Sequence, residues 1–255
     1  MSAIGAGLKR AGVAIAAAFA YFSILPVGRF ARGPGPDAAA LLALPLVGAV
    51  AGALAGFVAL GAARFAPHAL VAAFALGAAI VATGAIHLDG YLDGCDAFFA
   101  SVPAARRLEI LKDPHHGTFA LAGLLVLGAT WYAALVTLPA NAYPATLALC
   151  GALGRGAALI GATTYPYARG GRVDAAGLIL VLATIASAAF LYVPVALAFV
   201  PVALALAWLL ARWIAGRLGG LLPGDGYGFI ITTLEVAGLT VAAMLFAAGR
   251  WPGHG

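Results

Sequence analysis

The sequence predicts an all-α integral membrane protein: a polytopic helical bundle with about seven transmembrane helices and a short interfacial or half-inserted helix near its N-terminus. Of the 255 residues, 64% are hydrophobic and only 9% are charged. Uncharged runs of about twenty residues, the length that crosses a bilayer as a helix, recur along the whole chain. Glycine and alanine are abundant and strand-like alternation is absent, which favours closely packed helices over a β-barrel.

The first apolar run, 11–25, is short and follows Lys9 and Arg10, so that it resembles a signal peptide in outline. The next apolar run begins near Ala38 without a soluble domain in between. We therefore expect 11–25 to belong to the mature protein. We predict a half-inserted or interfacial helix there, with the N-terminus on the cytoplasmic side.

Seven longer apolar runs follow, and each can cross about 30 Å of hydrocarbon at about 1.5 Å per residue, some with tilt. The predicted spans are 38–63, 66–86, 118–138, 143–164, 175–193, 195–211 and 229–248. In the first span, Gly48, Gly52 and Gly56 share one helix face and predict a close helix contact, either within the chain or at a homodimer seam. We treat 1–255 as a single transmembrane catalytic domain.

The basic residues predict the orientation. If the seven spans alternate across the bilayer and segment 87–117 is cytoplasmic, only Arg64 and Arg250 lie outside. Nine basic residues are then cytoplasmic: Arg29, Arg32, Arg106, Arg107, Lys112, Arg169, Arg172, Arg212 and Arg217. This positive-inside pattern predicts a multi-pass protein of the cell (inner) membrane with its polar loops in the cytoplasm. The net charge of +5 therefore indicates topology and not nucleic-acid binding.

The acidic residues are concentrated at one membrane boundary. Asp89, Asp93 and Asp96, in "HLDGYLDGCD", follow the span that ends at Ile86 and are spaced by four and three residues. On a continuous helix their carboxylates share one face, about 5–6 Å apart, and like charges this close favour a cation between them. Such oxygen ligands suit Mg²⁺ or Mn²⁺ shared with a phosphate. The alternative is a solvated acidic face, and His87 is either a packing residue or a partner of a carboxylate.

Basic residues follow the acids by ten to twenty positions. Arg106, Arg107 and Lys112, in "RRLEILKD", either anchor the chain at the membrane surface or bind phosphate, because metal ions with Arg and Lys clamps are usual in phosphoryl transfer. Arg155 lies inside a predicted span, where it either forms a structural lock with a carboxylate or contacts an anionic substrate. Arg169 lies at the cytoplasmic end of that span. Near the last span, Asp225 stands in the glycine-rich "LGGLLPGDGYG", where a backbone can approach a ligand closely.

Together these motifs resemble the signature of the adenosylcobinamide-GDP ribazoletransferase family, also called cobalamin-phosphate synthase. The segments that carry the resemblance are "HLDGYLDGCDAFF", "RRLEILKDPHHGTFA", "GRGA", "YPYAR" and "LGGLLPGDGYG". The resemblance implies a membrane enzyme that joins adenosylcobinamide-GDP to α-ribazole or α-ribazole phosphate with Mg²⁺. The products would be GMP and adenosylcobalamin or its phosphate. A ribose hydroxyl would attack the phosphorus that bears the aminopropanol arm.

The resemblance also suggests roles for the site residues. Asp89, Asp93 and Asp96 would hold one or two metal ions, and Asp225 or Asp113 would complete the shell. The substrate phosphates would be bound by Arg106, Arg107, Lys112, Arg155 and Arg169. The catalytic residues would be Asp89, Asp93, Asp96 and Lys112, with Asp96 as the base that takes the hydroxyl proton.

Two alternative functions remain open at this point. A CDP-alcohol phosphotransferase-like phospholipid enzyme also places spaced aspartates on membrane helices, in the arrangement DGxxAR…GxxxDxxxD. Here "DGYLDG" lacks the Ala-Arg of that arrangement, and no GxxxDxxxD follows. A cation-coupled transporter could use Asp89, Asp93 and Asp96 as its cation site. Acids on a transport path lie near mid-membrane, however, whereas these follow the end of a span and precede a basic loop.

Overall fold

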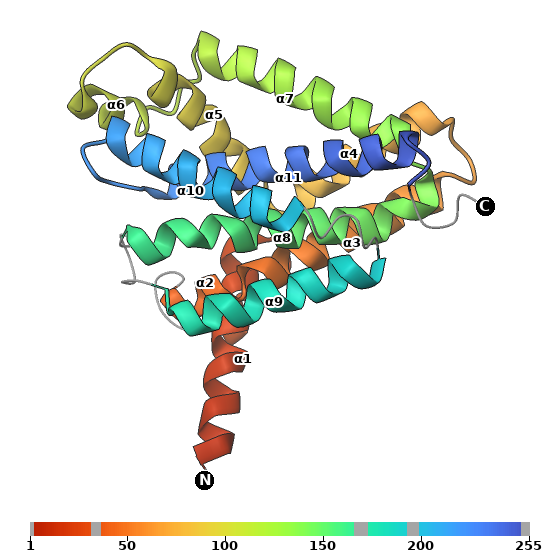
Figure 1. The fold of residues 1–255 in the computed structure, drawn as a ribbon, viewed down its shortest axis with the longest axis horizontal. Helices are drawn as coiled ribbons and strands as arrows, with labels where there is room; N and C mark the ends of the chain where they lie inside the picture. Colours follow the sequence, from red (N-terminus) through yellow and green to blue (C-terminus); the bar gives the residue numbers. More distant parts are fainter. Residues whose placement is uncertain (1–2, 32–36, 166–172, 193–198, 251–255) are drawn as a thin grey trace.

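The computed structural model describes residues 3–31, 37–165, 173–192 and 199–250, and within them it contains helices and no strand. The α-helices are α1 (Ala3–Phe22), α2 (Ala38–Leu42), α3 (Leu44–Ala62), α4 (His68–Ala82), α5 (Ile86–Phe99), α6 (Ala104–Ile110), α7 (Thr118–Thr137), α8 (Tyr143–Thr164), α9 (Ala175–Tyr192), α10 (Phe199–Arg217) and α11 (Gly224–Ala247). Two short 3-10 turns are η1 (Gly28–Phe30) and η2 (Ala140–Ala142). The long helices of the bundle run along one common direction, and α1 projects from it (Figure 1).

Five helical segments among the described residues are long and apolar enough to cross a membrane: Leu44–Ala62, Thr118–Thr137, Ala140–Thr164, Phe199–Arg217 and Gly224–Ala247. The pair α4 and α5, which meet at a bend of 90°, is a sixth candidate. This confirms a polytopic helical membrane protein. The expected count of seven spans is not confirmed. One reason is that the run expected to cross at 66–86 is helical only to Ala82 before the chain turns.

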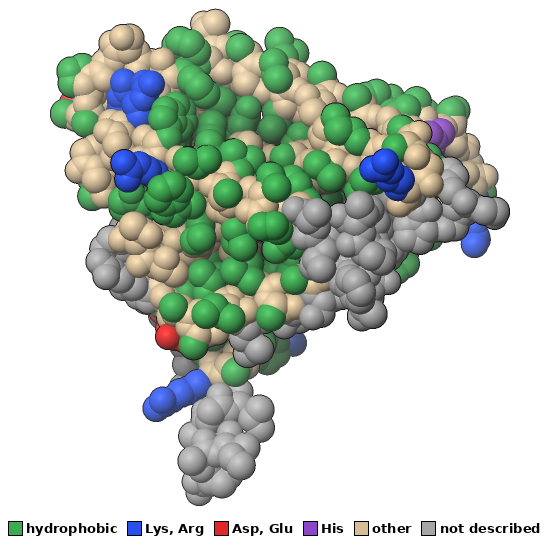
Figure 2. Space-filling model, viewed as in Figure 1, with side chains coloured by type: hydrophobic (Ala, Val, Ile, Leu, Met, Phe, Trp, Pro, Cys, Tyr) green, Lys and Arg blue, Asp and Glu red, His purple; other side chains and the backbone are tan. Residues whose placement is uncertain are grey.

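Side chains on the bundle surface fit contact with lipid. Figure 2 shows hydrophobic side chains spread across the visible face, with only a few lysines and arginines. Leu125 and Val126 of α7 are 74% and 70% exposed. Such exposure of large apolar side chains on a long apolar helix is favourable when the surrounding solvent is hydrocarbon.

The centre of the bundle is a close contact between α3 and α8. Gly48, Gly52 and Gly56 of α3 face the α8 backbone between Tyr143 and Gly151, and a Cβ added at any of the three glycines would collide with that backbone. The small side chains let the two helix backbones touch. Of the two interpretations that the sequence left open for this glycine stripe, the structure shows packing within the chain.

A left-handed turn separates α4 from α5. Gly84 and Ala85 have φ angles of 60° and 58°, and the N–H of Ala85 donates to the carbonyl of Ile80 at 3.0 Å, which is the hydrogen bond of a Schellman cap. Beyond the turn, segment 87–117 contains helices α5 and α6 where the sequence suggested a loop. The motif "HLDGYLDGCD" therefore lies on a continuous helix, which was the condition for its three aspartates to share one face.

Helix α1 begins earlier than the expected segment 11–25. Its C-terminal half contacts the bundle through Ala18 and Phe22, which are buried, while Lys9 and Arg10 are exposed. In Figure 1 its N-terminal end points away from the other helices. It is not among the candidate spans in the described residues. Its place at the membrane interface stays a prediction.

Candidate functional site

The acidic residues are brought together where α5 crosses α11. A Cβ added at Gly90 of α5 would lie 3.0 Å from the Cα of Asp225, and one added at Gly228 of α11 would lie 3.0 Å from the Cα of Gly90. The two glycines thus let the helix backbones touch, and this contact holds the first turn of α11 beside Asp89 and Asp93. Gly90 is therefore a contact residue within a continuous helix.

Asp89 and Asp93 form a cluster with His116 in which one ligand atom of each residue lies within 4.8 Å of the others. His116 Nδ1 is 3.4 Å from Asp93 Oδ1. Asp225 is an electrostatic neighbour of both Asp89 and Asp93. Carboxylates this close repel one another unless a cation lies among them. Carboxylate oxygens and one imidazole are a donor set that fits a divalent ion such as Mg²⁺ or Mn²⁺.

Asp96, one turn further along α5, uses both carboxylate oxygens at the start of α7. Its Oδ2 accepts the N–H of Gly117 at 2.5 Å, and its Oδ1 accepts the N–H of Ala120 at 3.0 Å. A carboxylate placed this way satisfies free N–H groups at the helix N-terminus and interacts favourably with the helix dipole. The contacts that the structure shows for Asp96 are therefore structural. Its roles as metal ligand and base stay predictions.

Asp113 lies outside this cluster. Its Oδ1 accepts the backbone N–H of His115 at 3.0 Å and lies 2.8 Å from Nδ1 of the same residue. These hydrogen bonds with His115 lower the pKa of the exposed Asp113 carboxyl group. The histidine that meets the α5 acids is the next one, His116.

Two of the expected phosphate-binding side chains are exposed on or next to α6. Arg106 forms an exposed ion pair with Glu109 at 2.6 Å, and such a pair contributes little stability in water, so that Arg106 is free to exchange its partner for a ligand. Lys112 is exposed four residues before His116. Arg169, also expected to bind phosphate, lies outside the described residues.

Arg107, in contrast, is only 7% exposed and closes the end of α5. Its guanidinium donates to the carbonyls of Ala97, Phe98 and Val102 at 3.3, 3.0 and 2.9 Å. Arg217 of α10 donates to the same Phe98 carbonyl at 3.0 Å. The last carbonyls of a helix have no partner within the helix, and these arginines supply one. In the structure Arg107 therefore contacts backbone where a phosphate contact was expected.

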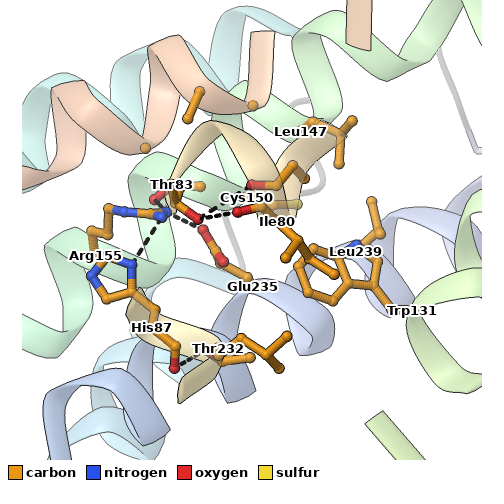
Figure 3. A pocket seen from close by; sticks show the side chains of 16 residues that line it. Ile80, Thr83, His87, Trp131, Leu147, Cys150, Arg155, Thr232, Glu235 and Leu239 are labelled. Carbon is orange, nitrogen blue, oxygen red and sulfur yellow. Dashed lines mark hydrogen bonds and ion pairs between the residues drawn. The ribbon is translucent and has the colours of Figure 1, made fainter. Parts of the chain in front are cut away.

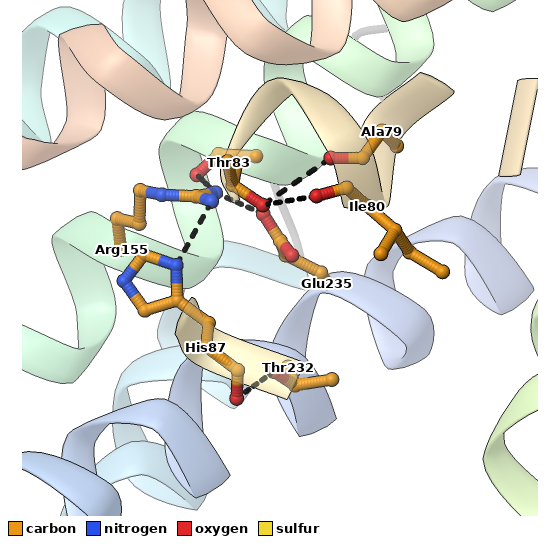
Figure 4. Close-up of polar contacts among 8 residues, drawn as sticks. Ala79, Ile80, Thr83, His87, Arg155, Thr232 and Glu235 are labelled. Atoms are coloured by element: carbon orange, nitrogen blue, oxygen red, sulfur yellow. Dashed lines mark hydrogen bonds and ion pairs between the residues drawn. The ribbon is translucent and has the colours of Figure 1, made fainter. Parts of the chain in front are cut away.

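Arg155 is 2% exposed and lies in a buried polar network with His87 and Glu235 (Figures 3 and 4). It forms an ion pair with Glu235 of α11 and donates to Nδ1 of His87 at 3.3 Å and to the Gly151 carbonyl at 3.1 Å. The Thr232 hydroxyl donates to the His87 carbonyl at 2.9 Å. Of the two interpretations of Arg155, these contacts match the structural lock, which joins α5, α8 and α11. The surrounding cavity, about 40 Å³, has room for water but not for a substrate.

A larger cavity, of about 320 Å³, also has His87 in its wall and lies among α1, α2, α3, α5, α8 and α11. Asp89 and Asp225 line it, and aromatic and aliphatic side chains supply most of the remaining wall. The acids at the α5–α11 crossing therefore border a space that can hold part of a ligand.

Comparison with known proteins identifies the family. A model of the family described as cobalamin-5-phosphate synthase matches residues 14–243. The chain belongs to the cobalamin-5-phosphate synthase family. This is the family that the sequence motifs indicated, and membership assigns the chain to the transferases of cobalamin biosynthesis. It excludes the phospholipid enzyme and the transporter as descriptions of the chain.

Relatives named adenosylcobinamide-GDP ribazoletransferase match most of the length of this chain. The one from Deinococcus radiodurans is 37% identical over 223 residues, which are 80% of this chain and 75% of the relative. The one from Pseudomonas paraeruginosa is 32% identical over 252 residues, 93% of this chain and 100% of the relative. A third, from Stutzerimonas stutzeri, is 34% identical over 221 residues, 83% of this chain and 89% of the relative. No solved structure shows a significant match.

Sequence reasoning missed His116 as a member of the acid cluster in this synthase. The signal was the pair His115-His116 directly before α7, in the family motif "KDPHHGTFA". The Asp96 carboxylate accepts the N–H of Gly117. His116, the residue before that glycine, is thereby held next to Asp93, which lies one turn before Asp96 on α5. The contact depends on this cap, which a sequence pattern does not reveal.

Proposed function

We propose that the chain joins adenosylcobinamide-GDP to α-ribazole or α-ribazole phosphate at the acid cluster of α5. A ribose hydroxyl attacks the phosphorus that bears the aminopropanol arm, the bond from that phosphorus to the GMP oxygen breaks, and GMP leaves with the electron pair. The observation that carries the proposal is the cluster of Asp89, Asp93, His116 and Asp225, formed by the motifs of the synthase family.

The proposed ligands of a divalent cation, Mg²⁺ or Mn²⁺, are Asp89, Asp93 and His116, with Asp225 beside them. Asp113 and Asp96 have other contacts and are less suited. When bound, such an ion would neutralise charge on the pyrophosphate and on the departing GMP. Imidazole nitrogen suits Mn²⁺ better than Mg²⁺, so that both ions are worth testing.

Alignment of the reactants, phosphate binding and acceptance of the proton are roles of the protein's own residues. The touching backbones of α5 and α11 hold Asp89 and Asp225 in fixed positions, which supports the alignment that an in-line displacement needs. Arg106 and Lys112 would bind phosphate oxygens, the arginine through two nitrogens and the lysine as a point charge. For the hydroxyl proton, Asp93 is a better acceptor than Asp96, because both oxygens of Asp96 already accept N–H groups.

We also propose that the cluster faces the cytoplasm of the inner membrane. The basic residues of the segments that precede and follow the membrane spans, among them Arg106, Lys112 and Arg217, support this side through the positive-inside rule.

The test is an assay of the purified protein in detergent with adenosylcobinamide-GDP, α-ribazole phosphate and Mg²⁺ or Mn²⁺. We expect GMP and a corrinoid of larger mass, and we expect loss of both after chelation and recovery when the cation is returned. The relative from Deinococcus radiodurans, assayed in parallel, controls for the substrates. If that relative turns over and this chain yields neither product, the proposal is wrong.

A further inference from the structure

We propose that the cavity of about 320 Å³ beside the acids is the binding site of the ribazole substrate. Its aromatic base would occupy the apolar part, and its ribose would lie at Asp89 and Asp225. The inference rests on the proposed function and adds to it which of the two substrates enters the protein and which side chains recognise it.

The size of the cavity selects the smaller substrate. Binding sites for small molecules have volumes of about 300–1,000 Å³, and this cavity lies at the lower end of that range. It can admit a single nucleoside-sized group and is far too small for a corrinoid ring. Adenosylcobinamide-GDP would therefore approach the acids from outside the cavity, while the attacking nucleoside is bound inside it.

The wall of the cavity suits a planar aromatic group. Tyr21 and Phe22 from the end of α1, Tyr227 from α11 and the aliphatic Leu44 and Ile231 line it. Aromatic rings pack favourably against one another in stacked or edge-on geometries, in addition to the area they bury. Helix α1 thus supplies part of a substrate site.

The polar end of the cavity suits ribose. The carboxylates of Asp89 and Asp225 line it from two different helices, and ionised carboxylates accept hydrogen bonds from hydroxyl groups. The hydroxyls of the ribose, which can donate to these carboxylates, are therefore expected to face them. This places the attacking hydroxyl next to the cluster that contains Asp93 and His116.

A buried N–H donor without a hydrogen-bond partner indicates how the aromatic base of ribazole is recognised. His87 lines the cavity and is 6% exposed. Its Nδ1 lies 3.3 Å from the Arg155 guanidinium, which can only donate, so that Nδ1 accepts and the ring proton is on Nε2. Nε2 has no hydrogen-bond partner among the described residues, and burying a polar group without a partner is unfavourable.

A base linked to ribose through one ring nitrogen keeps its other ring nitrogen as an acceptor, and this atom can accept a hydrogen bond from His87 Nε2 once the base displaces the atoms that now cover that nitrogen. The imidazole ring is held for that contact from two sides. Arg155 binds its Nδ1, and Phe22 stacks on it with a centroid distance of 5.7 Å and an interplanar angle of 11°.

The first arm of the test narrows the cavity. Gly224 lines it, and a Cβ added there meets no atom within 4 Å, so that Gly224→Phe should fold. We expect the KM for α-ribazole to rise about tenfold or more and the KM for adenosylcobinamide-GDP to stay unchanged. Gly216→Phe on α10, where an added Cβ is equally free of contacts, should change neither. An unchanged KM for ribazole in Gly224→Phe, or a rise confined to the corrinoid, overturns the inference.

The second arm changes the ligand and uses His87→Phe as its control. An analogue of α-ribazole with C–H in place of the free ring nitrogen should bind the wild-type protein about tenfold more weakly than α-ribazole in calorimetry without corrinoid. In His87→Phe the two ligands should bind equally. Equal binding by the wild type overturns the contact with His87. Because this arm measures binding alone, it separates failure of the cavity assignment from failure of the proposed reaction, which the turnover assay reports.

Discussion

Asp93 is the residue on which the charges of the site converge. Asp89, Asp225, Asp96 and His116 all interact with its carboxylate electrostatically. Replacing Asp93 by asparagine keeps the shape of the side chain and removes its charge. The variant therefore loses a metal ligand or a proton acceptor but leaves no empty space in the packing.

We expect Asp93→Asn to lower kcat by about 100-fold or more, the range of general acid–base and metal-ligand losses, while the midpoint of thermal unfolding in detergent stays the same or rises because repulsion is relieved. Asp113→Asn is the matched control, because that carboxylate pairs with His115 away from the cluster. It should keep activity within a few-fold. A near wild-type rate for Asp93→Asn with Mg²⁺ would contradict the proposed site.

Asp96 is expected to act through structure. Asp96→Ala removes the cap of α7 and should lower the free energy of unfolding by about 0.5–2 kcal/mol, the usual loss for an N-cap residue. Activity should also fall, since His116 loses the contact that positions it. If Asp96→Asn instead keeps full thermal stability and loses all turnover, Asp96 is the base after all.

The ion pair of Arg155 and Glu235 allows a test by double substitution. Removing one partner of a buried pair leaves an uncompensated charge and costs about 3–5 kcal/mol. We expect Arg155→Met and Glu235→Leu each to destabilise the protein strongly in urea or thermal unfolding, and the double variant to recover most of the loss. If the two single losses simply add, the pair is not a structural lock.

At the scale of elements, the crossing of α5 with α11 determines the geometry of the acids. A Cβ at Gly90 would lie 3.0 Å from the Cα of Asp225, and the contact is with backbone that has no rotamer to change. Gly90→Ala should therefore push the helices apart and weaken Mn²⁺ binding, measured by electron paramagnetic resonance. Gly77→Ala on α4, where an added Cβ meets nothing within 4 Å, should leave binding unchanged and raise helix stability by up to about 1 kcal/mol. Equal Mn²⁺ binding in both variants would show that the crossing does not set the site.

The elements also show what the sequence could and could not reveal. Long apolar runs and the spacing of Asp89 and Asp93 were sufficient to predict the helices and a shared carboxylate face. The burial of Arg107 was not predictable, because its partners are carbonyls at the end of α5, and backbone groups leave no mark in a sequence. His116 was missed for a similar reason, since it meets Asp93 through a cap between two helices.

At the scale of the molecule, the family and the helical membrane class followed from sequence alone, whereas the number of spans did not. Composition reports that a run is apolar but not where a helix bends. Gly84 and Ala85 turn the chain by a left-handed cap inside a run that reads as one span.

The orientation can be tested by labelling in a variant without its own cysteines, Cys95 and Cys150. A cysteine at Glu109, which is exposed on α6, should react with a membrane-impermeant maleimide only in inverted vesicles. A cysteine at Arg64, exposed after α3, should react in spheroplasts. The reverse pattern would place the acid cluster on the outer side and would contradict the proposed cytoplasmic site.

The short helix α4 has a consequence for how the protein would respond to its lipids. Its 15 residues cover about 22 Å, less than the hydrocarbon thickness of about 30 Å. If the 90° bend lies towards the cytoplasm, the polar helix α5 begins below the level of the lipid headgroups, and the bilayer must thin locally to keep it in water. Turnover should then fall as acyl chains lengthen, which makes the enzyme sensitive to membrane thickness.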